Sequence, residues 1–290
     1  MRTRLAIFFL LACAALSAQT DPWKPIADAL GRSGKEQPGG VYKVGLPRSD
    51  MHVTVDGVSL KPALALGSWL AFKKMGDQAM VMGDLVLSED EVEPVMLKLQ
   101  QSGIEQTALH NHVLHESPRV MYMHISGHGD GVKLATALKE ALALTATPAP
   151  AAPAAAAPDL GLEAGAIGTA LGGKGTVNGG VLQFSVPRSE TIHDGGMEIP
   201  PSMGTATAIN FQPTGNGKAA VTGDFVLLGS EVNPVIRVLR EGGIQVTAVH
   251  SHMLSEEPRL FFMHFWANDD AVKLAEVLHG ALAKTNSAKK

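Results

Sequence analysis

The sequence predicts an α+β fold made of two tandem homologous domains, each a mainly antiparallel sheet with two or three helices packed on one face. Three observations lead to this fold class. Residues 41–142 match residues 181–282 at a constant offset, which indicates a duplicated domain. Strand-like and helix-like segments alternate in the same order within each copy. A chain of 290 residues is also long enough for two domains that each bury a core.

The first elements of each copy are a short helix and a strand. The helices are expected at residues 26–30 and 160–171, and the strands at residues 41–46 and 181–186. Each of these strands ends in Pro-Arg-Ser. A further strand pair follows, which in the first copy ends over residues 80–87 and carries the dipeptide Gly-Asp.

An amphipathic helix, a β-hairpin and a last helix complete each copy. In the first copy, apolar side chains recur at helical spacing over residues 91–101, and Gly103 marks the expected end of that helix. Residues 105–114 and 119–126 are expected to pair as the hairpin, and the last helix follows over residues 130–142. The second copy repeats this order, so both domains are expected to share one fold.

The boundaries of these domains follow from the repeat and from changes in composition. We assign residues 19–144 to the first repeat domain and residues 159–286 to the second. Between them, residues 145–158 read TATPAPAAPAAAAP, an uncharged Ala/Pro tract typical of a semi-rigid spacer. Such a spacer lets the copies move apart, unless they dock on each other like the halves of a homodimer.

The first residues have the features of a secretory signal peptide. Arginines at positions 2 and 4 precede an apolar stretch over residues 5–15, and small residues follow around Ala18. We therefore expect residues 1–18 to be a signal peptide and the protein to be periplasmic or secreted. The alternative is a lipoprotein, because Cys13 ends a Leu-Leu-Ala-Cys sequence that resembles a lipobox and would carry the lipid anchor.

Composition excludes several classes of protein. The net charge of -4 and the lack of a dense Lys/Arg run argue against a nucleic-acid-binding surface. After the N-terminus no apolar run is long enough to span a bilayer, so the mature chain is not expected to be an integral membrane protein. Cys13 is the only cysteine. A transition-metal site in the folded part would therefore use His, Asp, Glu or Met.

Three histidines recur in each copy and form the main candidate site. His110 and His112 share one face of a strand, because successive side chains of a strand point to opposite faces. The turn Glu116-Ser117-Pro118 is expected to return the chain so that His124 lies opposite His110, at about 5 Å. The second copy repeats this pattern with the following histidines: His250, His252 and His264.

Three imidazoles at this spacing are able to share one metal ion, bound at about 2.0 to 2.1 Å per nitrogen. The expected cofactor is a divalent metal, zinc or copper. A single histidine in an apolar strand is more often a core residue that donates to a backbone carbonyl. The alternatives are therefore a purely hydrogen-bonded histidine cluster or a pocket for an organic ligand.

Further ligands are available next to these histidines: Glu116, Glu256, His115, Asp84 and Asp224. Glu116 is also the candidate catalytic residue, since a carboxylate beside a metal-bound water can handle protons. Ser255 stands where the first copy has His115. The first copy is therefore the better candidate for activity.

Four arginines recur after prolines and are candidate ligands for a carboxylate or phosphate: Arg48, Arg119, Arg188 and Arg259. The alternative role is to neutralise a nearby carboxylate such as Asp84 or Glu116. Three methionines, Met121, Met123 and Met263, are expected on the strand face away from the histidines, as core residues and not as copper ligands.

The segment ALHNHVLHESPRVMYMH, together with PRSD, MGDLVL and EVEPV, resembles the LppY/LpqO-type family of bacterial envelope proteins. The resemblance covers most of both copies. It implies export, often as a lipoprotein, and supplies no established reaction. The second copy departs from it at SHMLSEEPR and lacks the PALALGSW run, which implies a weakened or purely structural second domain.

These observations predict an exported metal-binding protein with a three-histidine site for zinc or copper in each repeat. With an open coordination position, the metal would lower the pKa of bound water to about 7 and support hydrolysis of an ester or amide. Metal storage or delivery without catalysis is a second possibility. A third is a non-catalytic envelope-binding or anion-binding module with structural histidines. The expected partner is a small-molecule or cell-envelope ligand.

Overall fold

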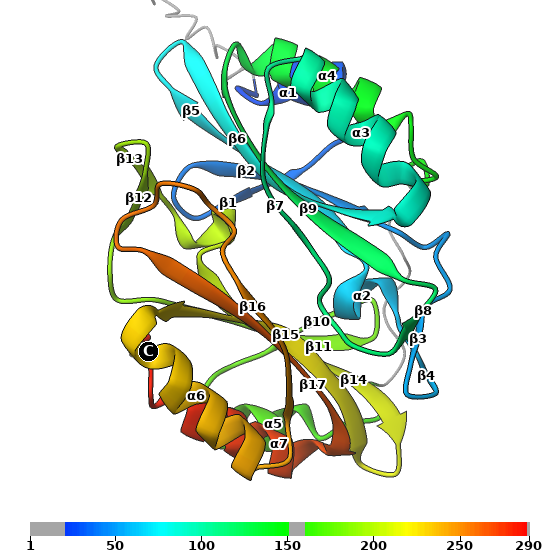
Figure 1. Cartoon of the computed structure of the whole chain (residues 1–290), viewed down its shortest axis with the longest axis vertical. Coiled ribbons are helices and arrows are strands. Elements are labelled where there is room, and N and C mark those ends of the chain that lie inside the picture. The colour runs from blue at the N-terminus through cyan, green and yellow to red at the C-terminus, as the bar shows by residue number, and fades with distance from the viewer. Residues whose placement is uncertain (1–20, 151–159, 289–290) are drawn as a thin grey trace, which may run out of the picture.

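A computed structural model of the chain describes residues 21–150 and 160–288 (Figure 1). The predicted signal peptide, with Cys13, lies outside the described residues, as do residues 151–158 of the predicted spacer. Each repeat forms a six-stranded antiparallel sheet with helices packed on one face, which confirms the predicted α+β fold class. None of the described helices is long and apolar enough to cross a membrane.

In the first repeat the helices on the outer face are α1 (Lys24–Leu30), α3 (Glu89–Gln101) and α4 (Gly131–Leu142). Across the sheet, the strand order is β1 (Lys35–Gln37), β2 (Val41–Pro47), β5 (Gly67–Met75), β6 (Gln78–Ser88), β9 (Val120–Gly129) and β7 (Glu105–His110). The last two strands, which carry histidines, therefore form one edge of the sheet.

The second repeat has the same arrangement. Its outer helices are α5 (Ala164–Leu171), α6 (Gly229–Glu241) and α7 (Ala271–Leu282). Across the sheet, the strand order is β10 (Thr176–Asn178), β11 (Val181–Pro187), β14 (Ala206–Gly215), β15 (Lys218–Leu228), β17 (Leu260–Asp270) and β16 (Gln245–His250). The duplication seen in the sequence is thus a duplication of the whole fold.

Alternation along each strand divides the side chains between two cores. On β6, Val81 and Leu85 pack in the core beneath the helices, whereas Met82 points to the opposite face. Met123 and Met263 also lie in the helix-side cores, as the alternation predicted. The opposite face of each sheet is buried too, and it is covered by the other repeat.

The two sheets pack with these inner faces against each other, so that the molecule has four layers with helices outside and sheets inside (Figure 1). The docking that the sequence left open therefore occurs. Each repeat also extends an arm over the sheet of the other repeat.

The first arm is residues 51–66, with β3 (Thr54–Val55), β4 (Val58–Ser59) and α2 (Pro62–Ala65). The second arm is residues 192–205, with β12 (Ile192–Asp194), β13 (Met197–Ile199) and the 3₁₀ turn η1 (Pro201–Met203).

Hydrogen bonds fix each arm on the other repeat. The Gln212 side chain accepts from the Lys61 amide at 2.8 Å and donates to the Ser59 carbonyl at 2.8 Å. In the other direction, Lys73 Nζ donates to the Glu198 carbonyl at 2.8 Å. Buried amide groups that are paired in this way specify one docking geometry. The arms therefore set how the two sheets meet.

The register of the histidine hairpin differs from the prediction. A bulge between Gln106 and Ala108 shifts the pairing of β7 with β9. As a result His124 lies opposite Ala108, whereas His110 lies opposite Tyr122. His110 and His124 are diagonal neighbours, and their ring centroids are still only 5.1 Å apart.

The connection between these strands is also longer than predicted. β7 ends at His110, so His112 lies in the loop beyond the strand. Instead of forming a tight turn, Glu116–Ser117 makes a short strand, β8, that pairs with the arm strand β3. In the second repeat, His193 and Glu257 pair in an equivalent bridge. The arms hold both loops in place, which sequence periodicity alone does not predict.

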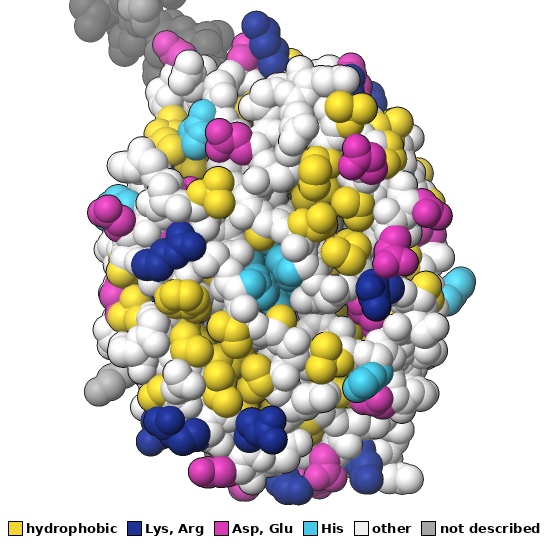
Figure 2. Space-filling view, in the orientation of Figure 1, with side chains coloured by type: hydrophobic (Ala, Val, Ile, Leu, Met, Phe, Trp, Pro, Cys, Tyr) yellow, Lys and Arg dark blue, Asp and Glu magenta, His cyan; other side chains and the backbone are white. Residues whose placement is uncertain are grey.

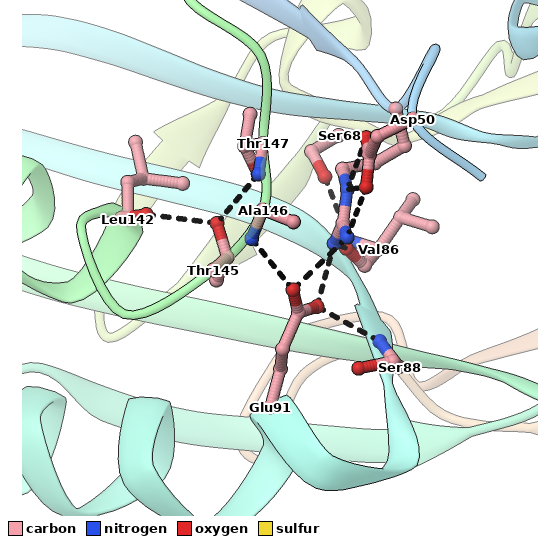
Figure 3. A network of polar contacts seen from close by, with 10 residues as sticks. Asp50, Ser68, Val86, Ser88, Glu91, Leu142, Thr145, Ala146 and Thr147 are labelled. Carbon is pink, nitrogen blue, oxygen red and sulfur yellow. Dashed lines mark hydrogen bonds and ion pairs between the residues drawn. The ribbon is translucent and has the colours of Figure 1, made fainter.

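A buried ion pair ties the start of α3 to the sheet and to the end of the repeat. Arg48 donates to Glu91 at 2.7 and 3.0 Å, to Asp50 and to the Val86 carbonyl. Figure 3 shows Glu91 among its partners, where its carboxylate accepts from the Ala146 amide at 2.7 Å. The first residues of the predicted spacer are therefore held against the first repeat.

Candidate metal centre

The six repeated histidines come together in one place between the two sheets. We call them the histidine cluster: His110, His112, His124, His250, His252 and His264. The first and fourth of these end strands β7 and β16, two lie on β9 and β17, and two lie in the loops that follow the edge strands. Histidine side chains are visible at the centre of the face drawn in Figure 2, between the two repeats.

Within the cluster, each histidine packs against a histidine of the other repeat. The ring centroids of the three pairs are 3.7 Å apart for His110 and His250, 3.8 Å for His112 and His264, and 3.6 Å for His124 and His252. The sequence predicted one trio in each repeat. The structure brings the two trios into contact, so they form one centre.

One nitrogen of each ring is free to act as a ligand. The Nε2 atoms of all six rings are buried and have no hydrogen-bond partner among the described residues. Three rings use the other nitrogen: His110 Nδ1 lies 3.2 Å from the Asn111 carbonyl, and His264 Nδ1 lies 2.8 Å from the Gly223 carbonyl. His250 makes the same contact with its neighbouring carbonyl at 3.4 Å. A proton on Nδ1 leaves the Nε2 lone pair available, as in metal-bound histidines.

Burial keeps these histidines neutral. It lowers the pKa of His110 to about 3, with a further contribution from His250, and it lowers the pKa of His250 to about 4. The pKa of the other four is well below the ordinary value of 6.5 for the same first cause, strengthened by neighbouring histidines. Neutral imidazole is the form that binds a metal ion.

Two aspartates lie at the edge of the cluster, of which Asp84 is buried and Asp224 is half-buried. Asp84 Oδ1 is 3.9 Å from His124 Nε2, and Asp224 Oδ2 is 3.8 Å from His252 Nε2. Neither contact is an ion pair, because the histidines are neutral. Burial raises the pKa of Asp84 to about 7 and that of Asp224 well above its ordinary value. Both residues thus lie where the sequence placed candidate further ligands.

Glycines before these aspartates allow the close approach of neighbouring strands. A Cβ atom on Gly223 would overlap the carbonyl of Ala208 on β14, and one on Gly83 would lie 2.8 Å from the Trp69 carbonyl. The Gly-Asp dipeptide therefore combines strand packing with an inward carboxylate.

The space beside the cluster is small. A cavity of about 10 Å³ is lined by His124 and His252 from the cluster and by Met82, Met203 and Met253. This volume holds about one water molecule. The flank of the cluster therefore accepts an ion or a very small ligand and not a bulky organic molecule.

Three other candidate ligands lie apart from the groups of close histidine nitrogens. Glu116 accepts from the Val120 amide at 3.1 Å and from Asn111 at 3.2 Å, and Glu256 accepts from the Leu260 amide at 2.9 Å. Both carboxylates brace their own loops. His115 is exposed and adopts a left-handed backbone conformation, with φ of 58°. Burial raises the pKa of Glu116, whose predicted catalytic role stays a prediction.

The four arginines fall into two classes. Arg48 and Arg188 are buried, and each guanidinium is held by two carboxylates and a backbone carbonyl, which are Glu231, Glu190 and Val226 in the case of Arg188. These two arginines serve protein carboxylates other than the two suggested by the sequence. Arg119 and Arg259 are 65% and 49% exposed, so their guanidinium groups remain accessible.

Sequence reasoning missed the aromatic rings that border the cluster. Tyr122 stacks on His112 with ring centroids 3.3 Å apart, and Phe262 stacks on His252 at 3.6 Å. A signal was present, because these residues stand two positions before His124 and His264 and therefore share their strand face. The rings shield the cluster and hold the loop histidines in place.

The fold and this centre define a duplicated α+β protein with an inter-repeat histidine cluster, in which two groups of histidines could hold a metal ion. Residues 24–144 and 165–284 match the family described as Domain of Unknown Function (DUF1259). These matches cover both repeats and more than half of the chain, and the protein belongs to this family.

No curated protein matches the sequence. Among solved structures, the trimeric bacterial microcompartment shell protein PduB matches with 10% identity and a TM-score of 0.22, over 87% of this chain and 89% of its own. EtuB from Clostridium kluyveri matches with 8% identity and a TM-score of 0.23, over 87% and 91%. TM-scores this low carry no argument about fold or function.

Proposed function

We propose that this protein is an exported metal-binding protein that holds zinc or copper at the histidine cluster. The observation that carries the proposal is that six rings whose buried Nε2 atoms have no hydrogen-bond partner among the described residues supply two groups of close ring nitrogens. Leaving such an atom unpaired costs about 1–3 kcal/mol. Bound metal would remove this cost. Imidazole ligands suit zinc and copper, whereas magnesium and calcium prefer oxygen.

The surroundings favour metal binding over hydrolysis of a large substrate. A hydrolase would need room for its substrate beside a metal-bound water, and the cavity at His124 and His252 holds about one water molecule. The anion-binding alternative is also less well supported. The cluster is neutral, and Arg48 and Arg188 are taken by protein carboxylates.

Export is part of the proposal and rests on the N-terminal sequence. The apolar stretch over residues 5–15 and the small residues around Ala18 support a signal peptide, and Cys13 supports the lipoprotein alternative. The resemblance of the HNHVLHESPR segment to LppY/LpqO-type envelope proteins supports the same location. Mass spectrometry of the mature N-terminus distinguishes cleavage near Ala18 from acylation of Cys13.

Metal analysis of the purified protein tests the function. Protein stripped with a chelator, incubated with Zn(II) or Cu(II) and desalted should retain stoichiometric metal. The double variant with His110→Ala and His250→Ala should retain at least ten-fold less at limiting metal concentration, since each group of close nitrogens then loses at least one ligand. His115→Ala is the matched control, because His115 is exposed and outside the cluster. Protein that retains no metal would refute the proposal.

A further inference from the structure

The ring nitrogens of the cluster do not form a single coordination sphere. Nitrogens that all lie within 4.8 Å of one another form two groups. One group is His110, His112 and His124, and the other is His110, His250, His252 and His264. Opposite ligands of one ion lie about 4.2 Å apart, twice the Zn–N bond length. A single ion with six nitrogens would therefore bring all six into one group, and the structure has two.

His110 belongs to both groups but has one nitrogen to offer. Its Nδ1 lies 3.2 Å from the Asn111 carbonyl, so only Nε2 faces the cluster. If His110 joined the second group, that group would have four histidines, and His112 and His124 would be left as a pair. With His110 in its own repeat, each repeat keeps a trio, as the internal duplication of the sequence favours.

Each trio has a carboxylate beside it. Asp84 lies 3.9 Å from the Nε2 atom of His124, and Asp224 lies 3.8 Å from that of His252. Two ligands of a tetrahedral ion are about 3.4 Å apart for bonds of about 2.1 Å, so a small movement suffices. Oδ1 of both aspartates is buried and has no hydrogen-bond partner among the described residues. In Asp84 this is the atom near His124, whereas in Asp224 the atom near His252 is Oδ2, and Oδ1 lies 4.0 Å from His264 Nδ1. Each trio thus has one further oxygen ligand available.

We propose that the histidine cluster is a two-ion centre, in which each ion is held by the three histidines of one repeat and by Asp84 or Asp224. This inference rests on the proposed function and specifies its stoichiometry and its ligands. Three neutral nitrogens and one carboxylate give each divalent ion a four-ligand site. The contacts between the trios make the two sites neighbours.

Titration of the metal-free full chain with Zn(II) and Co(II) tests this inference, with bound metal measured by mass spectrometry of the intact protein. The expected stoichiometry is two ions per chain. Asp84→Asn and Asp224→Asn should each lower the affinity for one ion at least ten-fold and leave the affinity for the other ion unchanged. Asp77→Asn, in the exposed turn between β5 and β6, is the matched control and should keep both ions.

The outcomes separate the two proposals. One ion per chain would overturn the two-ion centre and leave the proposed function standing, and no bound metal would overturn both. Full affinity for both ions in the two Asn variants would overturn the assignment of the carboxylates. If an Asn variant fails to fold, Asp84→Glu and Asp224→Glu keep an oxygen ligand and should bind two ions. Spin coupling between two Co(II) ions in the wild type is expected, and two isolated signals would contradict a shared centre.

Discussion

At the residue scale, His264 combines a structural contact with a free ligand atom. It is 2% exposed, and its Nδ1 lies 2.8 Å from the carbonyl of Gly223. In a purely structural histidine, this hydrogen bond would be the only function of the ring. Its Nε2 is instead directed to a region that it shares with histidines of the other repeat. The hydrogen bond orients the ring, and that orientation makes the remaining lone pair useful.

Lys43 makes the two halves of the centre unequal. Burial lowers its pKa to about 8, and Asp84 opposes that shift, so a cationic lysine lies near the first-repeat carboxylate. Gln183 stands at the equivalent position in the second repeat. Because like charges repel, we expect the first ion to bind at the second-repeat site.

Lys43→Gln, which copies the second repeat, should tighten binding at the first-repeat site by roughly ten-fold, since it removes a like charge close to the metal. Competition with a chromophoric chelator measures both affinities. Lys43 donates to the Ser202 carbonyl of the second arm, and Lys73 donates to the Glu198 carbonyl of the same arm. Lys73→Gln is therefore the control, because Lys73 lies at the exposed end of β5. Unchanged affinities in the Lys43 variant would contradict the electrostatic argument.

Much of the centre could be predicted at this scale. The recurrence of the three histidines in each repeat follows from the sequence spacing, whereas the bulge in β7 and the position of His112 in the loop after the strand do not. The partner of Arg48 does not, since Glu91 is brought to it by the start of α3 and not by a sequence pattern. The contact between His110 and His250 depends on docking of the repeats, which no local rule specifies.

At the element scale, the Arg48 ion pair joins a strand end, a helix start and the end of the repeat. Glu91 accepts from Arg48, from the Ser88 amide at the start of α3 and from the Ala146 amide. The second repeat builds the same joint with Glu231. The joint fixes the helix layer relative to the sheet that carries the histidines.

Arg48→Met should destabilise the protein by about 3–5 kcal/mol, because it leaves the Glu91 carboxylate buried without its cation. Urea unfolding followed by circular dichroism measures the loss. Arg119→Met should cost less than about 1 kcal/mol, since Arg119 is 65% exposed and 3.8 Å from Glu89. An equal loss of stability in the two variants would show that the buried ion pair does not hold the strand end, the helix start and the end of the repeat together.

The arms and the bulge in β7 are the elements that the sequence did not predict. Strands β6 and β9 were predictable because each is a largely apolar run that is buried at nearly every position. The strand pairs of the arms are only two or three residues long and pack on the other repeat, so their own sequence lacks periodicity. The bulge at Gln106 changes the register of β7 without a glycine or proline to mark it.

At the scale of the whole molecule, the neutral histidines make the metal-free protein sensitive to acid. Unfolded histidines bind protons below a pKa of about 6.5, whereas folded His250 and His110 do so only at about 4 and 3. Stability is therefore lost as pH falls below about 6.5. Protonation of Asp84 has the opposite effect, because its raised folded pKa of about 7 makes the folded state more stable as the pH falls. Since six histidines lose stability and only two aspartates gain it, the net effect of acid is a loss of stability.

Chelator-treated protein should therefore lose stability on the order of several kcal/mol between pH 7 and pH 5. Urea midpoints at the two pH values measure this loss. A variant with His110→Gln and His250→Gln should show a smaller loss, since two of the titrating groups are absent. A midpoint that does not change with pH would mean that the cluster is not buried in its neutral form.

Metal binding should stabilise the whole molecule as one unit, because the trio that holds each ion packs against the trio of the other repeat. At a free metal concentration one hundred times the dissociation constant, one bound ion adds about 2.7 kcal/mol to the free energy of unfolding. Thermal unfolding of the metal-loaded protein should then show a single transition at a higher midpoint than the metal-free protein. The double variant with His110→Ala and His250→Ala should lose most of this increase, because both sites then lack a ligand, and His115→Ala should keep it. Two separate transitions in the loaded protein would show that the repeats unfold independently, and that the centre does not join them.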